Sequence, residues 1–471
     1  MIFSSLTFMA FLIVLIGVIA MVRQDRARKI ILLLASYIFY AAWEVEFLTL
    51  IIGCSLWWSW WLGLLMYQSN SVAKKKALLA LSLTLDLAML GYFKYANFFI
   101  DSFTQLLGIE NAGALNIILP VGISFFTFQA MSYNIDLYRG NIQLCRDLIK
   151  FLLFVAFFPQ LVAGPVVRAS EFLPQLDQHV RLHAKNITIG AQIFIIGLLQ
   201  KSLVGDNLSK YVDPVFSNPA MYDTATLWTA LAAYSVQIFC DFSGYTLMAI
   251  GVARMFGFEL PTNFRMPYLS LSITEFWRRW HMTLSRWLRD YLYISLGGSR
   301  KGEMRTNVNL MLTMLLGGLW HGSSWNFVLW GGLHGLGLVI HRYWRNVSPA
   351  NYLNGAPLAG YNVLCWAVTL VYICLLWVPF RCTDFSLTGQ YFSGLFTPTD
   401  GIHWLHTSSV VLLVGVAIWH LIYQFNGRML NTLPSEQLFQ SYRPLMLVGL
   451  MLLSLALFAP NETSPFIYFQ F

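Results

Sequence analysis

The class of fold is decided by residues 6–29, LTFMAFLIVLIGVIAMVRQDRARK. Residues 6–22 carry no charge, and this is about the length of helix that crosses a hydrocarbon core of roughly 30 Å. No Lys or Arg precedes the run, whereas four basic residues stand within residues 23–29. A secretory signal has the opposite charge order and ends in a small-residue cleavage site. We therefore interpret residues 6–22 as a retained membrane helix with its N-terminus outside the cell and its basic end inside.

The apolar character continues along the whole chain. Of 471 residues, 57% are hydrophobic and 11% are charged, against about 25% charged in a typical soluble domain. This composition excludes a soluble domain, a disordered chain and a protein with one membrane anchor. An outer-membrane barrel is excluded because barrels alternate polar and apolar residues in segments of about 10 residues. The sequence predicts an all-α polytopic membrane protein.

Further apolar runs lie at residues 30–43, 47–67, 77–93, 115–131, 148–163, 187–199, 227–256, 307–320, 325–341, 361–379, 408–422 and 444–458. They predict about ten to thirteen membrane helices, some short or re-entrant. Irregular backbone at membrane depth is tolerated only where it is buried or lines a cavity, so we expect an internal cavity. A mild boundary at residues 350–357 separates a motif-rich core, residues 1–345, from C-terminal membrane helices, residues 346–471, that complete the same domain.

The net charge of +8 fits Lys and Arg gathered in cytoplasmic loops better than it fits nucleic-acid binding. Glu44 and Glu46 divide two apolar runs, and three lysines follow at residues 74–76. We expect the acidic turn outside and the lysines inside. The six cysteines form no CxxC pair, which favours neither a disulfide framework nor a zinc site.

Tryptophan and arginine are concentrated together in residues 261–298. At helical spacing, Trp277, Trp280, Leu284, Trp287 and Tyr291 share one face, and Arg278, Ser285 and Arg289 share another. His281 lies at the border between these faces. The pattern predicts one amphipathic helix in the membrane interface. Its cationic face either binds anionic lipid headgroups or lines a cytosolic entrance for an anionic acyl donor such as coenzyme A.

The second unusual stretch is LLGGLWHGSSWNFVLWGGLHGLGLVIHRYW, residues 315–344. An ionisable residue deep in an apolar segment is a functional candidate, and His321 is the strongest one because glycines, serines and Asn326 surround it. His334 and His341 follow, each of which is either a packing residue or a functional one. The chain has no HExxH motif for a metal and no GxSxG motif for a serine nucleophile. We therefore predict that His321 acts as a general base on an acceptor hydroxyl, with His281 polarising the acyl carbonyl or assisting proton transfer.

The chain resembles the membrane-bound O-acyltransferase superfamily, in the branch of bacterial membrane subunits that O-acetylate alginate, cellulose and other exported polysaccharides. Five sequence blocks carry the resemblance: residues 3–43, FFPQLVAGPVVR (157–168), CDFSGYTLMAIGVARMFGF (240–258), residues 261–298 and GGLWHGSSWNFVLWGGLHG (317–335). The resemblance implies a ring of membrane helices around a central tunnel. It also implies that His321 is the superfamily's near-invariant histidine and that His281 is its second histidine.

The expected site residues fall into three groups. The catalytic residues are His321 and His281, the donor-binding residues are Arg278, Arg289, Ser285 and Trp320, and the further candidates are Asp241, Asn326 and His334. We expect no metal and no bound cofactor, with acetyl-CoA as the donor substrate. Where the branch has Ser-Asp after DFSGY, this chain has Thr246-Leu247, which puts any role of that carboxylate in doubt here.

The resemblance further implies partners and a location. We expect a periplasmic SGNH-type serine acetyltransferase, a polysaccharide synthase or export complex, membrane lipids and no nucleic acid. The chain would lie in the bacterial inner membrane. Two alternatives remain open. One is transfer of D-alanine or another acyl group from a carrier protein to a cell-wall polymer, and the other is a secondary transporter with His321, Asp241 and Arg278 as an ion relay, although no paired halves are visible.

Overall fold

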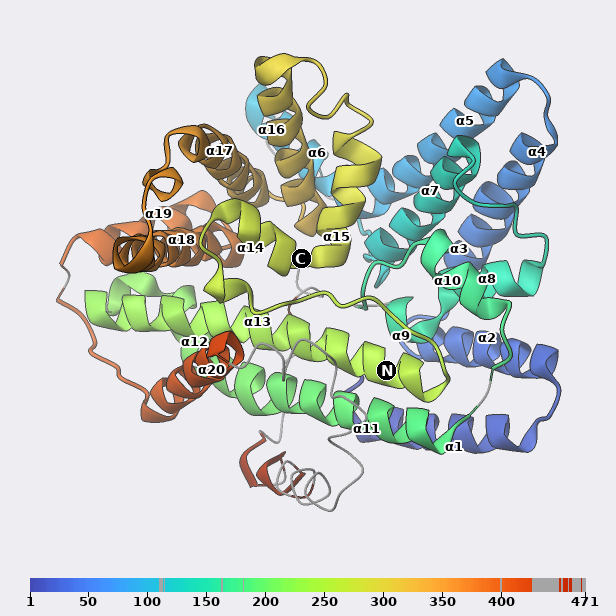
Figure 1. Cartoon of the computed structure of the whole chain (residues 1–471), viewed down its shortest axis with the longest axis horizontal. Coiled ribbons are helices and arrows are strands. Elements are labelled where there is room, and N and C mark those ends of the chain that lie inside the picture. The colour runs from blue at the N-terminus through green and yellow to red at the C-terminus, as the bar shows by residue number, and fades with distance from the viewer. Residues whose placement is uncertain are drawn as a thin grey trace. The chain divides into compact units, whose positions relative to one another are not determined.

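The computed structural model describes residues 1–425 except 110–112, 114, 162–163, 181 and 399, and beyond them residues 449, 452–455, 457–459 and 467 (Figure 1). Apart from one isolated bridge between Tyr222 and Ile402, the regular elements among the described residues are helices. The prediction of an all-α protein is confirmed. Most of the predicted run at residues 444–458 lies outside the described residues.

Within the described part of the chain, five helical stretches are long and apolar enough to cross a membrane: Leu48–Gln68, Val72–Leu107, Ala184–Ser217, Thr224–Met255 and Gly355–Arg381. Two shorter apolar helices are Leu6–Met21 and Thr407–Ile422. A multi-pass membrane protein is therefore confirmed. Several of the long stretches change from α- to π-helix along their length, which is one form of the irregularity that the short apolar runs predict.

The chain divides into two compact units. Unit 1 comprises Met1–Phe194 and Tyr245–Pro261, and unit 2 comprises Ile195–Gly244 and Thr262–Phe471. The residues on either side of the boundary predicted at 345 thus belong to one unit, and the division into a core and a C-terminal group stays a prediction.

Unit 1 has an aromatic core near its N-terminus. Its helices are α1 (Leu6–Met21), α2 (Asp25–Ala41), α3 (Leu48–Gly53), η1 (Cys54–Trp61), α4 (Leu62–Gln68), α5 (Val72–Leu90), η2 (Gly91–Tyr95), α6 (Ala96–Leu107), α7 (Ile123–Arg139), α8 (Leu148–Ala156), α9 (Phe158–Leu161), α10 (Ala169–Leu176) and most of α11 (Ala184–Leu198). Phe8, Phe39 and Phe158 are buried and have ring centroids 5.4–6.3 Å apart. Such contacts stabilise the packing of helices that are distant in sequence.

Unit 2 contains all the predicted site residues. Its helices are η3 (Leu199–Gly205), α12 (Asp206–Ser217), η4 (Pro219–Met221), the first two-thirds of α13 (Thr224–Met255), η5 (Pro267–Leu269), α14 (Ile273–Arg279), α15 (Met282–Trp287), η6 (Leu288–Tyr293), α16 (Gly302–His321), α17 (Trp325–Val347), η7 (Pro349–Asn351), α18 (Gly355–Arg381), α19 (Phe385–Phe396) and α20 (Thr407–Phe425). Its core is centred on the buried rings of Phe276, Trp280, Trp330, Trp377 and Tyr391.

Glycines set the closest helix contact in unit 2. A Cβ on Gly318 would lie 2.2 Å from the carbonyl oxygen of Phe327, and one on Gly331 would lie 2.3 Å from that of Met314. The backbones of α16 and α17 therefore touch, which larger residues would prevent. This antiparallel pair holds His321 at the turn between the two helices.

Candidate active site

The backbone breaks at His281, between α14 and α15. His281 has φ 40° and ψ 53°, a left-handed conformation that is uncommon for a residue with a side chain. Asn263 holds the following turn: its carbonyl oxygen accepts from the Met282 amide at 2.9 Å, and its side-chain oxygen accepts from the Thr283 hydroxyl at 2.9 Å. The prediction of a single amphipathic helix through residues 277–291 is wrong, because these bonds divide it into two short helices.

His281 is completely buried among aromatic rings and His321. Its ring centroid lies 4.7 Å from that of Phe242, 5.8 Å from that of Trp320 and 6.3 Å from that of His321. Burial lowers the pKa of His281 to about 3, because the charged imidazolium loses its hydration. The imidazole is therefore neutral at physiological pH and can donate one hydrogen bond and accept another.

His321 is the last residue of α16 and is 3% exposed. Edge-on rings surround it: Trp320 and Trp330 at 5.0 Å and Phe380 at 5.5 Å between centroids. The next residue must be glycine, since a Cβ on Gly322 would lie 2.1 Å from the ring of Phe327. The structure thus brings together the two histidines predicted to be catalytic and the predicted donor-binding residue Trp320.

His334 and Asn326 have packing partners within unit 2. The Trp277 indole donates to Nδ1 of His334 at 3.3 Å, and His334 is fully buried. The Asn326 amide donates to the carbonyl oxygen of Cys382 at 2.8 Å and to the Thr388 hydroxyl at 3.1 Å. These bonds join α17 to α14 and to the α18–α19 turn, which is how packing residues act.

Asp241 belongs to a buried ionic cluster. The Lys201 ammonium lies 2.5 Å from Asp241 and 2.7 Å from Asp206, and the three side chains are 5% exposed or less. A second oxygen of Asp241 accepts from the Ile467 amide at 2.9 Å. The partner of Asp241 in this cluster is thus a lysine, not the histidine and arginine of an ion relay.

The structure separates Arg278, on α14, from Ser285 and Arg289, which lie on the continuous helix of α15 and η6. Arg289 forms two bonds to the neighbouring Asp290, at 2.6 and 3.1 Å, and its side chain is 60% exposed. The Ser285 hydroxyl donates to the carbonyl oxygen of Trp280. Arg278 instead lines a pocket whose other lining residues, apart from His341, were not predicted to be functional. The break at His281 explains the separation, because the three side chains no longer stand on one helix.

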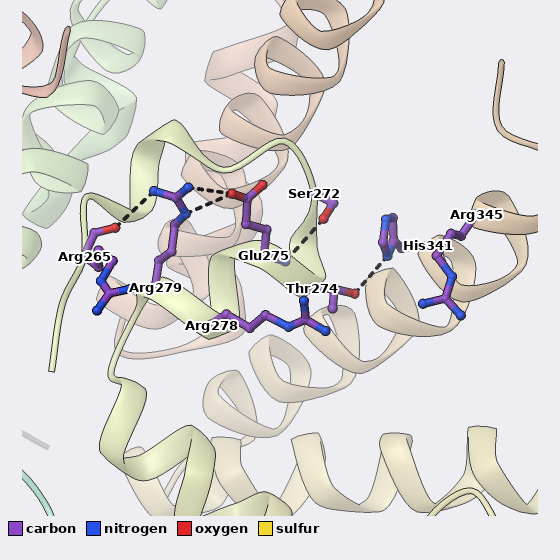
Figure 2. Close-up of a pocket in the computed structure, with 8 residues that line it drawn as sticks. All are labelled: Arg265, Ser272, Thr274, Glu275, Arg278, Arg279, His341 and Arg345. Carbon is purple, nitrogen blue, oxygen red and sulfur yellow. Dashed lines mark hydrogen bonds and ion pairs between the residues drawn. The ribbon is translucent and has the colours of Figure 1, made fainter. Parts of the chain in front are cut away.

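This pocket has a volume of about 460 Å³. It is lined by Arg265, Ser272, Thr274, Glu275, Arg278, Arg279, His341 and Arg345 (Figure 2). Glu275 pairs with Arg279 at 2.7 Å, and Arg279 also donates to the carbonyl oxygen of Arg265. Opposite, Thr274 and Nδ1 of His341 share a hydrogen bond of 2.8 Å. The signals in the sequence were His341 and the arginines in residues 265–279 and at the end of α17.

Among the described residues, no three His, Cys, Asp or Glu side chains gather as a metal site would require. The described residues of the site offer two buried imidazoles and, apart from them, an arginine-lined pocket. Two imidazoles can move a proton and polarise a carbonyl, and the pocket can bind an anion.

Comparison with known proteins agrees with this chemistry. The MBOAT, membrane-bound O-acyltransferase family, matches residues 37–378. The chain is 42% identical over 407 residues to the probable alginate O-acetylase AlgI of Pseudomonas syringae pv. tomato, covering 85% of this chain and 76% of that protein. It is 37% identical to the peptidoglycan O-acetyltransferase of Helicobacter pylori, covering 81% and 76%. It is 30% identical to the teichoic acid D-alanyltransferase of Bacillus subtilis, covering 49% of this chain and 60% of that protein.

Proposed function

The chain belongs to the membrane-bound O-acyltransferase family, and we propose that it takes an acetyl group from acetyl-CoA in the cytosol and passes it across the inner membrane for O-acetylation of an exported polysaccharide. The observation that carries the proposal is the buried pair of His281 and His321, with ring centroids 6.3 Å apart. At this separation, one reacting group that lies against the edges of both rings can contact both.

In the proposed step, His321 accepts the proton of an acceptor hydroxyl as its oxygen attacks the carbonyl carbon of the acetyl thioester. The C–S bond breaks, and the proton passes from His321 to the departing thiolate, so that a thiol and an acetyl ester result. His281, neutral at physiological pH, donates a hydrogen bond to the carbonyl oxygen as negative charge develops there. The aromatic rings around His321 exclude water, which would otherwise hydrolyse the thioester.

The names of the relatives guide the choice of group and polymer. The relatives that cover most of this chain are an alginate O-acetylase and a peptidoglycan O-acetyltransferase, which supports acetyl transfer and makes alginate the first polymer to test, with cellulose as a further candidate. Transfer of D-alanine or another acyl group is the second candidate, supported by a relative that covers half of the chain. The transporter alternative is dropped because the chain is an O-acyltransferase by family.

We further propose that a periplasmic SGNH-type serine enzyme receives the acetyl group, beside a synthase or export complex. The chain itself has no GxSxG block to form a serine ester. We place the N-terminus in the periplasm and the lysines at residues 74–76 in the cytosol. A cysteine introduced at position 75 should resist a membrane-impermeant thiol reagent in intact cells, and ready labelling would reverse this orientation.

The proposal is tested in membranes that contain the chain, given radiolabelled acetyl-CoA, the polymer and the periplasmic partner. We expect label in the polymer, and a loss of about 10²- to 10⁴-fold for His321→Gln at equal protein level. The control is His403→Gln, because His403 is 64% exposed and pairs with Asp223 away from this pair of histidines. Near-parental labelling by His321→Gln would refute the mechanism.

A further inference from the structure

The charges that line the arginine pocket do not balance. Its walls carry four guanidinium groups, from Arg265, Arg278, Arg279 and Arg345, and one carboxylate, from Glu275. Glu275 neutralises Arg279 at 2.7 Å. In the part of the chain that the structure describes, Arg265, Arg278 and Arg345 have no carboxylate within 4.0 Å, so the pocket holds an excess of three positive charges.

The three unbalanced arginines come from three different segments. Arg265 precedes η5, Arg278 is near the end of α14 and Arg345 is in the last turns of α17. Cations along one pocket repel one another, and a bound anion offsets that repulsion. Figure 2 shows Arg278 extending beneath Thr274 toward the side that His341 and Arg345 line. Arg265 lies on the other side of Arg279 from Arg278 and Arg345, so the positive charges are spread along the pocket.

The fixed residues of the pocket make it a formed site. Arg279 is held both by Glu275 and by the carbonyl oxygen of Arg265, and the second oxygen of Glu275 accepts from the Leu271 amide at 2.8 Å. When the Thr274 hydroxyl donates to Nδ1 of His341, the proton of the imidazole is on Nε2, where it can serve as a further donor. Pre-formed donors lower the entropy lost on binding.

We infer that this pocket binds the phosphate groups of the acyl donor and that it selects a nucleotide-bearing thioester over one carried by a protein. The inference rests on the proposed function. Guanidinium groups bind phosphate oxygens in pairs. Three unbalanced charges suit a diphosphate or a phosphomonoester, which carries about two negative charges, better than a phosphodiester, which carries one. Coenzyme A has both a diphosphate and a phosphomonoester, whereas a carrier-bound pantetheine and a lipid headgroup such as phosphatidylglycerol have a phosphodiester.

The volume agrees with this choice. A cavity of about 460 Å³ lies within the range of roughly 300–1,000 Å³ that small-molecule sites occupy. It exceeds the space that one phosphate group fills, so a larger part of a nucleotide can enter.

The test compares two acetyl donors with the purified full chain: acetyl-CoA, and S-acetylpantetheine, which has the same thioester and no phosphate. The parental chain should have a much lower KM for acetyl-CoA. Arg278→Gln with Arg345→Gln should raise that KM by about 10- to 100-fold, at a loss of roughly tenfold for each charged hydrogen bond, and should leave kcat/KM for S-acetylpantetheine unchanged. The matched control, Arg300→Gln with Arg342→Gln, removes the same charge outside the pocket.

Binding of adenosine 3′,5′-diphosphate, measured by calorimetry, separates this inference from the proposed function. The parental chain should bind it, and the Arg278/Arg345 double variant should not, even if no acetyl transfer is observed with either donor. Equal loss of both donors in the double variant, or unchanged use of acetyl-CoA, would overturn the inference. Nucleotide binding that is unchanged in the double variant would also overturn it. A third contrary result would be that phosphatidylglycerol in nanodiscs binds in the pocket and the nucleotide does not.

Discussion

Unit 2 contains two groups of charged side chains that differ in how their charges are balanced. The buried cluster of Lys201, Asp206 and Asp241 has one cation between two carboxylates, and all three side chains are 5% exposed or less. The arginine pocket has four cations and one carboxylate around a cavity of about 460 Å³. In the first group the protein supplies the counter-charges, and in the second it leaves most of them to a ligand.

The comparison distinguishes charges that hold the fold from charges that bind a substrate. A buried ion is stable only when its partners are part of the protein, since removing one partner leaves an uncompensated charge in a medium of low dielectric constant. Charges that face a cavity keep part of their hydration and can remain unpaired until a ligand arrives. Substitutions in the two groups should therefore have opposite signatures.

The largest effect is expected for Lys201→Met. It leaves two buried carboxylates without a cation, which should destabilise the protein by about 3–5 kcal/mol and abolish its accumulation. The measurement is the amount of monodisperse protein in detergent extracts, with Lys210→Met, an exposed lysine on α12, as the control. Normal accumulation of Lys201→Met would show that the cluster does not hold the fold.

Charge reversal in the pocket, Arg278→Glu, should have the opposite signature. The protein should accumulate normally, because Arg278 has no carboxylate partner among the described residues, while the KM for acetyl-CoA rises by about 100-fold or more through lost hydrogen bonds and repulsion. Arg289→Glu should raise the KM less, since Arg289 lies outside the pocket and pairs with Asp290. The measurement is the KM for acetyl-CoA of both variants at equal protein concentration. An equal rise in KM would mean that Arg278 and Arg289 both bind the donor, as the helical pattern predicted.

Asp241→Asn and Asp206→Asn test the balance within the buried cluster. Each variant keeps one carboxylate for Lys201, so both should accumulate at levels much nearer the parental chain than Lys201→Met does. Asp241→Asn should also lower kcat, by about tenfold if the loss is near 1.4 kcal/mol, because the next residue, Phe242, contacts His281 with ring centroids 4.7 Å apart. Asp206→Asn has no such neighbour in sequence. An equal drop in kcat for both variants would mean that the cluster acts on the site as a whole.

The smallest effect is expected for Glu275→Gln, and its sign is the informative part. Removing the pocket's carboxylate frees the charge of Arg279, so adenosine 3′,5′-diphosphate should bind a few-fold more tightly. Raising the salt concentration should reduce this gain, because exposed charges are screened. Calorimetry at two salt concentrations measures both effects. Weaker nucleotide binding would indicate that the Glu275 carboxylate serves mainly to hold the start of α14, where it accepts from the Leu271 amide.

Much of the fold and part of the site could be predicted from the sequence. Uninterrupted apolar runs indicated an all-helical membrane protein, since a spanning helix needs only local hydrophobicity and its own hydrogen bonds. His321 could be singled out because a titratable residue between Trp320 and Gly322 in an apolar stretch is unusual. The helical pattern of residues 277–291 was misleading. Spacing alone does not reveal that Asn263 accepts hydrogen bonds from the backbone amides at the start of α15.

The sequence by itself determined that the chain is a multi-pass helical membrane protein and that it has the motifs of an O-acyltransferase. Both properties follow from the order of residues along short stretches. Only the tertiary structure decided that His281 and His321 lie close together among aromatic rings. It also decided that Lys201 is the partner of Asp241, and that one pocket is lined by Arg265, Arg278 and Arg345. The physical reason is that each of these contacts joins side chains far apart in sequence, and such contacts depend on how helices pack and where the backbone breaks.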